Sequence, residues 1–355
     1  MNILLMVKRF QFGGAENHVC ELANALAAEG HQVWLLSGPG NQICRLNPAI
    51  RHKEVWFSDF KLPFHLFTLV RLIRNERIEI IHSHQRLPIF LGTLAARWCK
   101  IPVVATVHGS PLTDLKTIIV RKLVDRVITI RESCFELLKE SPSLHSKVVL
   151  IPNGIKLPAG PVPDHHEKRG FSLYYISRLD KHHAQLLKFF LTEVWPQMVR
   201  KYPDSNLFIV GDGSGLRSIR RFWRSGKFDP LRGNVRFGGY CREVPELFPK
   251  ADLVMGVGRV AIESLVHGVP LLSVKYNHLG PIVTQSNLKE MQFSNFVDLM
   301  ASAPDQTSML GRLYDFIDNR EFYEHEARSI QPVVQQAYNL DAIANRIIGV
   351  YREVI

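Results

Sequence analysis

The sequence predicts an α/β protein with two doubly wound parallel sheets. Short apolar runs alternate with amphipathic stretches of helical length through most of the chain. This alternation is typical of βαβ units, whose strands run parallel. It is interrupted at 157–168, a stretch rich in proline, glycine and charge, and then resumes. A chain of 355 residues is long enough for two such domains.

Composition and charge narrow the class of partner. The net charge is +11 and the pI is about 9.5, which suits an anionic partner such as membrane lipid, nucleic acid or a phosphorylated substrate. The five cysteines are scattered and form no C-x-x-C pair, which favours a reducing, cytoplasmic setting. The apolar run at 1–7 is too short for a signal peptide. No run approaches the roughly 20 apolar residues that a membrane-spanning helix needs.

The first predicted domain, 1–160, begins with a buried strand at Asn2–Val7, followed by Gly13 and Gly14 and a helix at Asn17–Glu29. Ligands of parallel sheets bind beyond the carboxyl ends of the strands, so the glycines and the histidines at strand ends, His82, His84 and His108, are candidates for a site. Further strands are predicted at His31–Leu36, Lys53–Phe57, Glu79–His82, Val103–Val107, Arg126–Ile130 and Val148–Ile151.

The second predicted domain, 161–335, repeats the pattern, and a final segment, 336–355, contains a helix at Leu340–Val354. The predicted strands of the second domain are Ser172–Ser177, Asn206–Val210 and Asn234–Gly238, with helices at His183–Lys201 and Val244–Phe248.

The stretch Ala251–Val274 is the most informative part of this domain. An apolar strand is broken by Gly256 and Gly258, and the helix that follows, Arg259–Val266, carries Glu263 one turn in. A glycine turn that leads into a helix presents backbone N–H groups and a positive dipole end, which suit a phosphate. A carboxylate one turn further suits the hydroxyls of a ribose. An ordinary strand–helix corner with a surface glutamate is the alternative interpretation.

Several motifs then resemble glycosyltransferase family 4, a family of the GT-B fold. They are GGAE at 13–16, VHGS at 107–110, SRLDKHH at 177–183, VGDGSGL at 210–216, FGGYCREVPELFPKADL at 237–253 and ESLVHGVP at 263–270. The resemblance implies two Rossmann-like domains facing a central cleft, with the last helix crossing back to the first domain. It also implies a nucleotide-diphosphate sugar as the donor.

The resemblance assigns roles to individual residues. Glu263 would hold the ribose, Arg178 and Lys181 the diphosphate, and His108 the donor sugar, while Glu16 and His84 would lie on the acceptor side. The chain departs from the family pattern at Met255, in place of a first glutamate, and at His183, in place of a lysine. We hypothesise that Arg259 supplies the missing positive charge. The other donor-binding residues are Gly13, Gly14, Gly211, Tyr240, Gly256 and Gly258.

These motifs predict a retaining hexosyltransferase that moves sugar from a UDP- or GDP-sugar to a glycan or lipid-linked acceptor, in cell-surface polysaccharide or lipopolysaccharide synthesis. Cationic side chains are needed to stabilise the negative charge on the departing phosphate. No metal or other cofactor is expected. The basic and aromatic stretches Phe60–Arg77 and Leu216–Phe228 predict peripheral docking on an anionic membrane, at the inner face of the plasma membrane.

Two alternatives stay open on the sequence. Met255 and His183 leave room for a GT-B-like nucleotide-sugar epimerase or a non-catalytic nucleotide-sugar binder. A basic nucleic-acid-binding protein would explain the pI, but no stretch resembles a known reading motif and the glycine turns would have no role. Nucleic acid is therefore not an expected partner.

Overall fold

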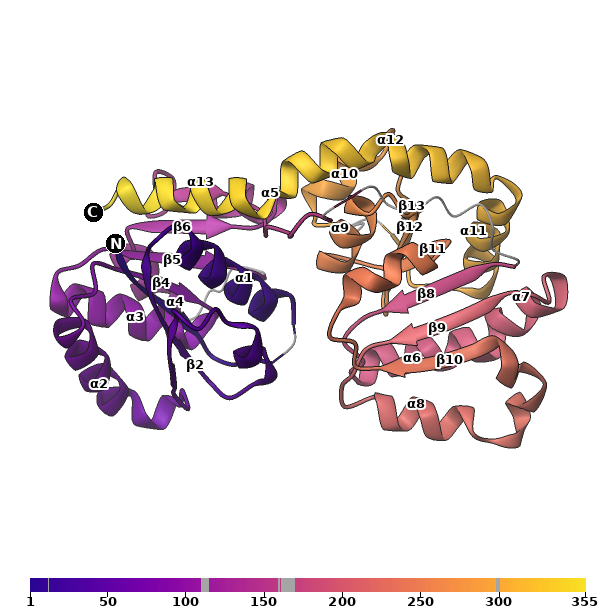
Figure 1. Ribbon diagram of the computed structural model, residues 1–355, viewed down its shortest axis with the longest axis horizontal. Coiled ribbons are helices and arrows are strands. Elements are labelled where there is room, and N and C mark those ends of the chain that lie inside the picture. The colour runs from indigo at the N-terminus through magenta and orange to yellow at the C-terminus, as the bar shows by residue number, and fades with distance from the viewer. Residues whose placement is uncertain (12, 110–114, 159, 161–169, 298–300) are drawn as a thin grey trace. The chain divides into compact units, whose positions relative to one another are not determined.

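The computed structural model describes residues 1–11, 13–109, 115–158, 160, 170–297 and 301–355. The chain divides into two compact units, one formed by residues 1–156 with 338–355 and the other by residues 157–337 (Figure 1). Each unit contains one sheet with helices packed against it, which confirms the doubly wound α/β class. Most of the predicted linker, 157–168, lies outside the described residues.

The first unit holds a seven-stranded sheet in the order β3-β2-β1-β4-β5-β6-β7, with all its strands parallel. The strands are β1 (Asn2–Val7), β2 (Gln32–Ser37), β3 (Arg51–Glu54), β4 (Ile80–His84), β5 (Val103–Val107), β6 (Arg126–Thr129) and β7 (Val148–Leu150).

Two hydrophobic cores cover the two faces of this sheet. Side chains alternate along a strand, so Leu5 of β1 packs with α1 (Gly14–Ala28) and α13 (Leu340–Arg352), whereas Leu4 packs on the opposite face. That opposite face carries α2 (Leu62–Asn75), α3 (Arg86–Cys99), α4 (Leu115–Leu123) and α5 (Glu132–Lys139). Two short 3₁₀ helices, η1 (Asn41–Arg45) and η2 (Asp59–Lys61), lie in the connections.

The second unit holds a six-stranded sheet in the order β10-β9-β8-β11-β12-β13. Its strands are β8 (Ser172–Ile176), β9 (Asn206–Val210), β10 (Val235–Gly239), β11 (Leu253–Gly256), β12 (Leu271–Lys275) and β13 (His278–Ile282). Its helical segments are α6 (Lys181–Phe189), η3 (Phe190–Val194), α7 (Trp195–Lys201), α8 (Leu216–Trp223), η4 (Gly226–Asn234), η5 (Val244–Lys250), α9 (Arg259–Val266), α10 (Leu288–Phe293), α11 (Gln306–Asp318) and α12 (Arg320–Tyr338).

Some predicted elements differ from the structure for identifiable reasons. The helix predicted at 183–201 is interrupted by the π-helical turn η3, where the Trp195 N–H donates to the Phe190 carbonyl. Pro196 has no N–H to donate one turn back, which disfavours a regular α-helix at this point. The edge strand β13 pairs antiparallel with β12 and is not predicted, because it contains Gly280 and Pro281.

Each sheet reverses its direction of growth at one place. In the first unit the reversal lies between β1 and β4, and in the second it lies between β8 and β11. The connections on either side of such a switch point diverge, which leaves a crevice outside the carboxyl ends of the two strands. Those four strand ends are therefore where a ligand site is expected.

Candidate functional site

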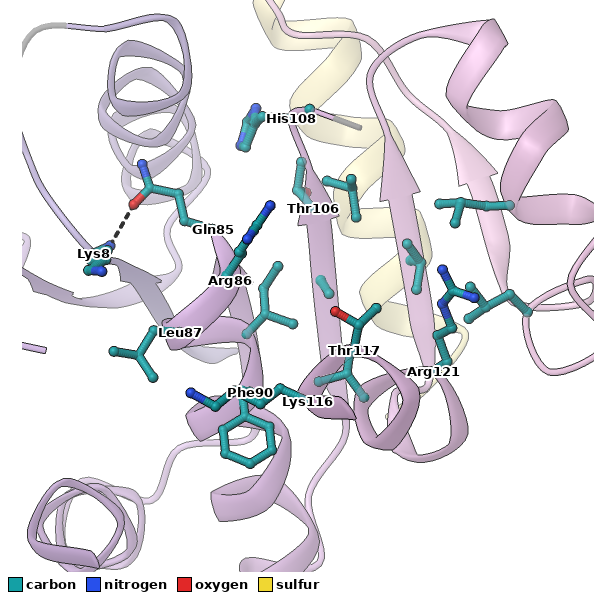
Figure 2. A pocket seen from close by; sticks show the side chains of 18 of the residues that line it. Lys8, Gln85, Arg86, Leu87, Phe90, Thr106, His108, Lys116, Thr117 and Arg121 are labelled. Atoms are coloured by element: carbon teal, nitrogen blue, oxygen red, sulfur yellow. Dashed lines mark hydrogen bonds between the residues drawn. The ribbon is translucent and has the colours of Figure 1, made fainter. Parts of the chain in front are cut away.

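Gln85 links the two sides of the switch point in the first unit. The backbone N–H of Lys8, just after β1, donates to Gln85 Oε1 at 3.0 Å (Figure 2). Gln85 Nε2 donates to Glu16 Oε1 at 2.9 Å, and Glu16 is 7% exposed. A Cβ at Gly14, the first residue of α1, would meet nothing within 4 Å, so a ligand can approach the backbone there.

Gln85 adopts a backbone conformation that non-glycine residues avoid. Its φ of 66° and ψ of 158° lie in a region that is essentially reserved for glycine and costs roughly 1–3 kcal/mol. The two side-chain hydrogen bonds help to hold it. Local patterning does not single out Gln85. The one sequence signal that indicates Gln85 is its position between His84, which ends β4, and Arg86, which begins α3.

Four histidines gather beside this crevice. His84 Nδ1 lies 3.0 Å from His108 Nε2, and the two rings stack with centroids 5.3 Å apart. The ring of His18, on α1, lies edge-on to His108 at 5.5 Å. His82 is held at both nitrogens, by the Tyr351 hydroxyl at 2.6 Å and the Thr106 hydroxyl at 2.7 Å. His84 and His108 therefore lie together at the site, whereas His82 ties α13 and β5 to β4.

Burial disfavours the charged form of His82, His84 and His108. Desolvation lowers the pKa of His82 to about 3 and that of His108 to about 4, and it also lowers the pKa of His84 well below its ordinary value. Two buried ring nitrogens, His84 Nε2 and His108 Nδ1, have no hydrogen-bond partner among the described residues. Whichever ring donates across the contact between His84 Nδ1 and His108 Nε2, one buried N–H is left unpaired among the described residues, on His84 Nε2 or on His108 Nδ1.

At the switch point of the second unit, Glu263 is paired with Arg259. Arg259 begins α9, separated by two residues from the end of β11, and its Nε donates to Glu263 Oε1 at 2.7 Å. The two side chains are 10% and 8% exposed, so Glu263 does not face bulk water. The spacing of four residues along a helix brings the pair together. Arg259 was predicted to face the diphosphate, whereas its Nε contacts the glutamate. A guanidinium has five N–H donors, so this bond does not by itself exclude a phosphate contact.

The glycines of the second unit let neighbouring loops pack directly on one another. Gly211 follows β9 with a φ of +139°, and a Cβ there would lie 1.8 Å from the Ser177 carbonyl oxygen. Gly258 has a φ of +61°, and a Cβ at Gly256 would lie 2.9 Å from the Val260 side chain. The loops after β8, β9 and β11 therefore form one edge. Arg178 is exposed on this edge, and Tyr240, just after β10, is 41% exposed.

The His183 side chain is held against Asp180, the N-cap residue of its own helix α6. The Asp180 carboxylate accepts the backbone N–H groups of His182 and His183, and His183 Nδ1 lies 2.9 Å from the same oxygen. Burial opposes ionisation of Asp180, but these hydrogen bonds outweigh it and lower its pKa. Lys181, the first residue of α6, is exposed and is the basic side chain nearest in sequence to Arg178.

Met255 lies inside the core of the second unit. It is 1% exposed and sits within β11, opposite Tyr175 of β8 and Leu272 of β12. A glutamate at this position would be buried in the sheet. The connection from β11 to α9 is short, formed by Val257 and Gly258. Met255 is therefore part of the hydrophobic core of the second unit and is not exposed at the carboxyl edge of its sheet.

The predicted residues thus fall into two sets, one in each unit. Glu16, His84 and His108 lie with Gly13 and Gly14 at the first switch point. The second set lies along the carboxyl edge of the other sheet and consists of Arg178, Lys181, Gly211, Tyr240, Gly256, Gly258, Arg259 and Glu263. The structure adds Gln85 and His18 to the first set. The chemical roles of both sets stay predictions.

Comparison with known proteins identifies the class. The model of Glycosyltransferase Family 4 matches residues 12–157, and that of Glycosyl transferases group 1 matches residues 170–296. Matched in order along one chain, and together with the fold, they show that the protein is a glycosyltransferase of the GT-B fold that is similar to family 4 and group 1.

Individual relatives are distant. A UDP-Gal:alpha-D-GlcNAc-diphosphoundecaprenol alpha-1,3-galactosyltransferase of Escherichia coli is 26% identical over 63% of this chain, and the match spans 61% of that relative's length. A phosphatidyl-myo-inositol mannosyltransferase of Mycobacterium tuberculosis is 21% identical over 96% of this chain and 93% of its own.

Solved structures share the fold over nearly the whole chain. A glycosyltransferase from Rickettsia africae ESF-5 has a TM-score of 0.78 at 16% identity, covering 99% of this chain and 98% of its own. Anabaena Alr3699/HepE, solved with UDP-glucose, has a TM-score of 0.76 at 16% identity, covering 99% of this chain and 100% of its own.

The strain at Gln85 predicts a difference between two substitutions. Gln85→Ala loses the side-chain hydrogen bonds and keeps the unfavourable φ, whereas Gln85→Gly loses the same bonds and relieves the strain. We expect the glycine variant to be more stable by about 1–2 kcal/mol. Hydrogen exchange of the β1 and β4 amides measures the stability of the first unit. Equal protection in the two variants would show that the backbone is not strained.

The buried histidines predict a loss of stability in mild acid. The unfolded chain takes up protons below a pH of about 6.5, whereas folded His108 does so only near its pKa of about 4. Stability is therefore full above pH 6.5 and falls as the pH drops toward 4, by roughly 1–2 kcal/mol per such histidine at pH 5.

Urea unfolding of the first unit at pH 7.5 and pH 5 measures this effect. His108→Gln should flatten the pH dependence, whereas replacement of the exposed His145 by glutamine should leave it unchanged. An unfolding midpoint that stays constant over this pH range would contradict the account.

Proposed function

We propose that the protein transfers a hexose, with retention of anomeric configuration, from a UDP-sugar to a lipid-linked acceptor in the synthesis of a cell-surface glycan. The observation that carries the donor assignment is the nearly buried Glu263 carboxylate, held one turn into α9 at the switch point of the second unit. A carboxylate in this place suits a ribose, and the start of the same helix suits a phosphate.

The choice of UDP rests on the comparisons. The Escherichia coli relative uses UDP-Gal by its name, and the structural neighbour HepE was solved with UDP-glucose. The acceptor class rests on the same relative, which acts on a diphosphoundecaprenol-linked sugar, and on the mannosyltransferase, which acts on phosphatidyl-myo-inositol. Both of these acceptors are lipids that carry phosphate.

The charges at the second switch point suit departure of a nucleoside diphosphate. Arg178 follows β8 and Lys181 begins α6, so both project from the loop beside β11. Cations and helix N-termini stabilise the negative charge that grows on the leaving phosphate. Because His183 is engaged with Asp180, Lys181 takes over the charge that a lysine at position 183 would supply. No metal is needed for this step in our proposal.

One helix of the first unit supports docking on a membrane. Within α2, Phe64, Phe67, Arg71 and Arg74 fall on one exposed stripe, aromatic at its start and basic toward its end. Phe64 and Phe67 are 67% and 70% exposed, and the preceding Phe60 is 99% exposed. Such a stripe suits the surface of an anionic bilayer. None of the helices within the described residues is long and apolar enough to cross a membrane.

The donor site predicts how single substitutions affect UDP affinity. Arg178→Ala removes a charge-assisted contact worth about 1.5–3 kcal/mol, so we expect UDP to bind about 10- to 100-fold more weakly. Glu263→Gln keeps the volume but removes the carboxylate that accepts the ribose hydroxyls, and a similar loss is expected. Isothermal titration with UDP measures both.

Arg200→Ala is the matched control, because the exposed Arg200 lies near the end of α7, which leads back to the opposite edge of the sheet. UDP affinity that is unchanged in the Arg178 and Glu263 variants would refute the donor assignment. Arg259→Ala is expected to lower turnover as well. If turnover were intact in that variant but lost in Arg178→Ala, Arg259 would not supply charge to the reaction.

The α2 stripe predicts lipid binding that depends on aromatic residues. Replacing Phe64 and Phe67 by serine should release most of the protein from vesicles that contain anionic lipid, because the aromatic rings no longer enter the interface. Vesicle co-sedimentation measures this. Phe322→Ser, at an exposed phenylalanine of α12, is the control and should not change binding. Equal binding to neutral and anionic vesicles would show that the basic residues of the stripe do not contribute to membrane binding.

A further inference from the structure

The first unit contains a pocket of about 640 Å³ that extends beyond the histidine cluster. Its lining extends from His108, just after β5, over residues of α3 and α4 to Leu138 of α5 and to Leu144. This volume is within the range of small-molecule sites, roughly 300–1,000 Å³. All of its lining residues belong to one unit, so the pocket does not depend on the placement of the other.

The inner part of the pocket is apolar. Leu87 of α3, Val120 of α4 and Val127 of β6 line it together with Leu138 and Leu144, and each is 8% exposed or less. Sugar hydroxyls need hydrogen-bonding partners, which these side chains cannot offer. The inner part therefore suits a hydrocarbon chain better than a sugar.

Basic side chains surround this apolar part. Lys8, Arg86, Lys116 and Arg121 line the pocket. The one carboxylate among its lining residues, Asp59, forms an ion pair with Lys116. In Figure 2 the Arg86 side chain lies near those of Thr106 and His108.

Arg86 is the first residue of α3, where the helix dipole already favours negative charge. A cation at this position is unfavourable for the helix itself. An anion bound there would offset that cost.

We propose that this pocket binds the lipid phosphate portion of the acceptor. The hydrocarbon chain lies between α3 and α4, the phosphate lies against Arg86 and Lys8, and the sugar to be extended lies toward His108. This assignment rests on the proposed function, in which the acceptor is lipid-linked. It goes further by naming the residues that recognise the lipid and by separating them from the surface stripe of α2.

Titration of the full-length protein with farnesyl phosphate tests the assignment, with farnesol and inorganic phosphate as the separated halves of the probe. We expect farnesyl phosphate to bind at least 10-fold more tightly than either half. Val120→Trp fills the apolar part and should weaken its binding at least 10-fold, whereas Ile118→Trp, at a 45% exposed position of the same helix, should not. Arg86→Ala should weaken binding of farnesyl phosphate but not of farnesol.

The assignment is overturned if Val120→Trp binds farnesyl phosphate as the unmodified protein does, or if inorganic phosphate binds equally well. Hydrogen exchange of the β1 and β4 amides shows whether the first unit is folded in these variants, and UDP titration tests the proposed donor site of the other unit independently. If farnesyl phosphate binds as expected but UDP does not, the lipid site stands and the proposed transfer from UDP-sugars fails. If only UDP binds, the lipid site fails while the donor assignment survives.

Discussion

The pairing of β8 with β11 is the constraint on which the proposed donor site depends. These two parallel strands are neighbours in the sheet although β9 and β10 intervene in the chain, so their outgoing loops diverge. One loop carries Arg178 and the other carries Arg259 and Glu263. The same arrangement recurs at β1 and β4 in the first unit, where Gln85 bridges the two loops. Topology thus brings together residues that are far apart in sequence.

The Arg259–Glu263 pair shows how a nearly buried carboxylate is stabilised by a neighbouring cation. A buried charge without a partner is costly, and both side chains of this pair are nearly buried. Arg259 compensates Glu263 and holds it in one orientation. A carboxylate held in one orientation can accept hydrogen bonds from ribose hydroxyls without reorganising, so the pair is compatible with a preorganised site.

Much of the fold can be predicted from the sequence, because the hydrophobic periodicity and the glycine and proline residues that end the elements indicate the same boundaries. The strands Asn2–Val7, Val103–Val107 and Asn206–Val210 and the helix Arg259–Val266 lie where the patterns predict them. The π-helical turn η3 and the edge strand β13 are less accessible, because they depend on single prolines and on pairing with a neighbour.

The site is predicted less completely than the fold. Motif spacing indicates Glu263 and His108, but it cannot show that Met255 is buried in the core or that His183 is bonded to Asp180. It also does not reveal Gln85, whose importance arises from a backbone conformation and from contacts to residues distant in sequence. Tertiary contacts decide these points.

The crystal structure of the complex with UDP is the most direct test of the central claim. The account predicts ribose hydroxyls within hydrogen-bonding distance of the Glu263 carboxylate, and phosphates between Arg178 and the start of α9. A nucleotide bound elsewhere on the chain, with Glu263 still contacting only protein, would contradict it.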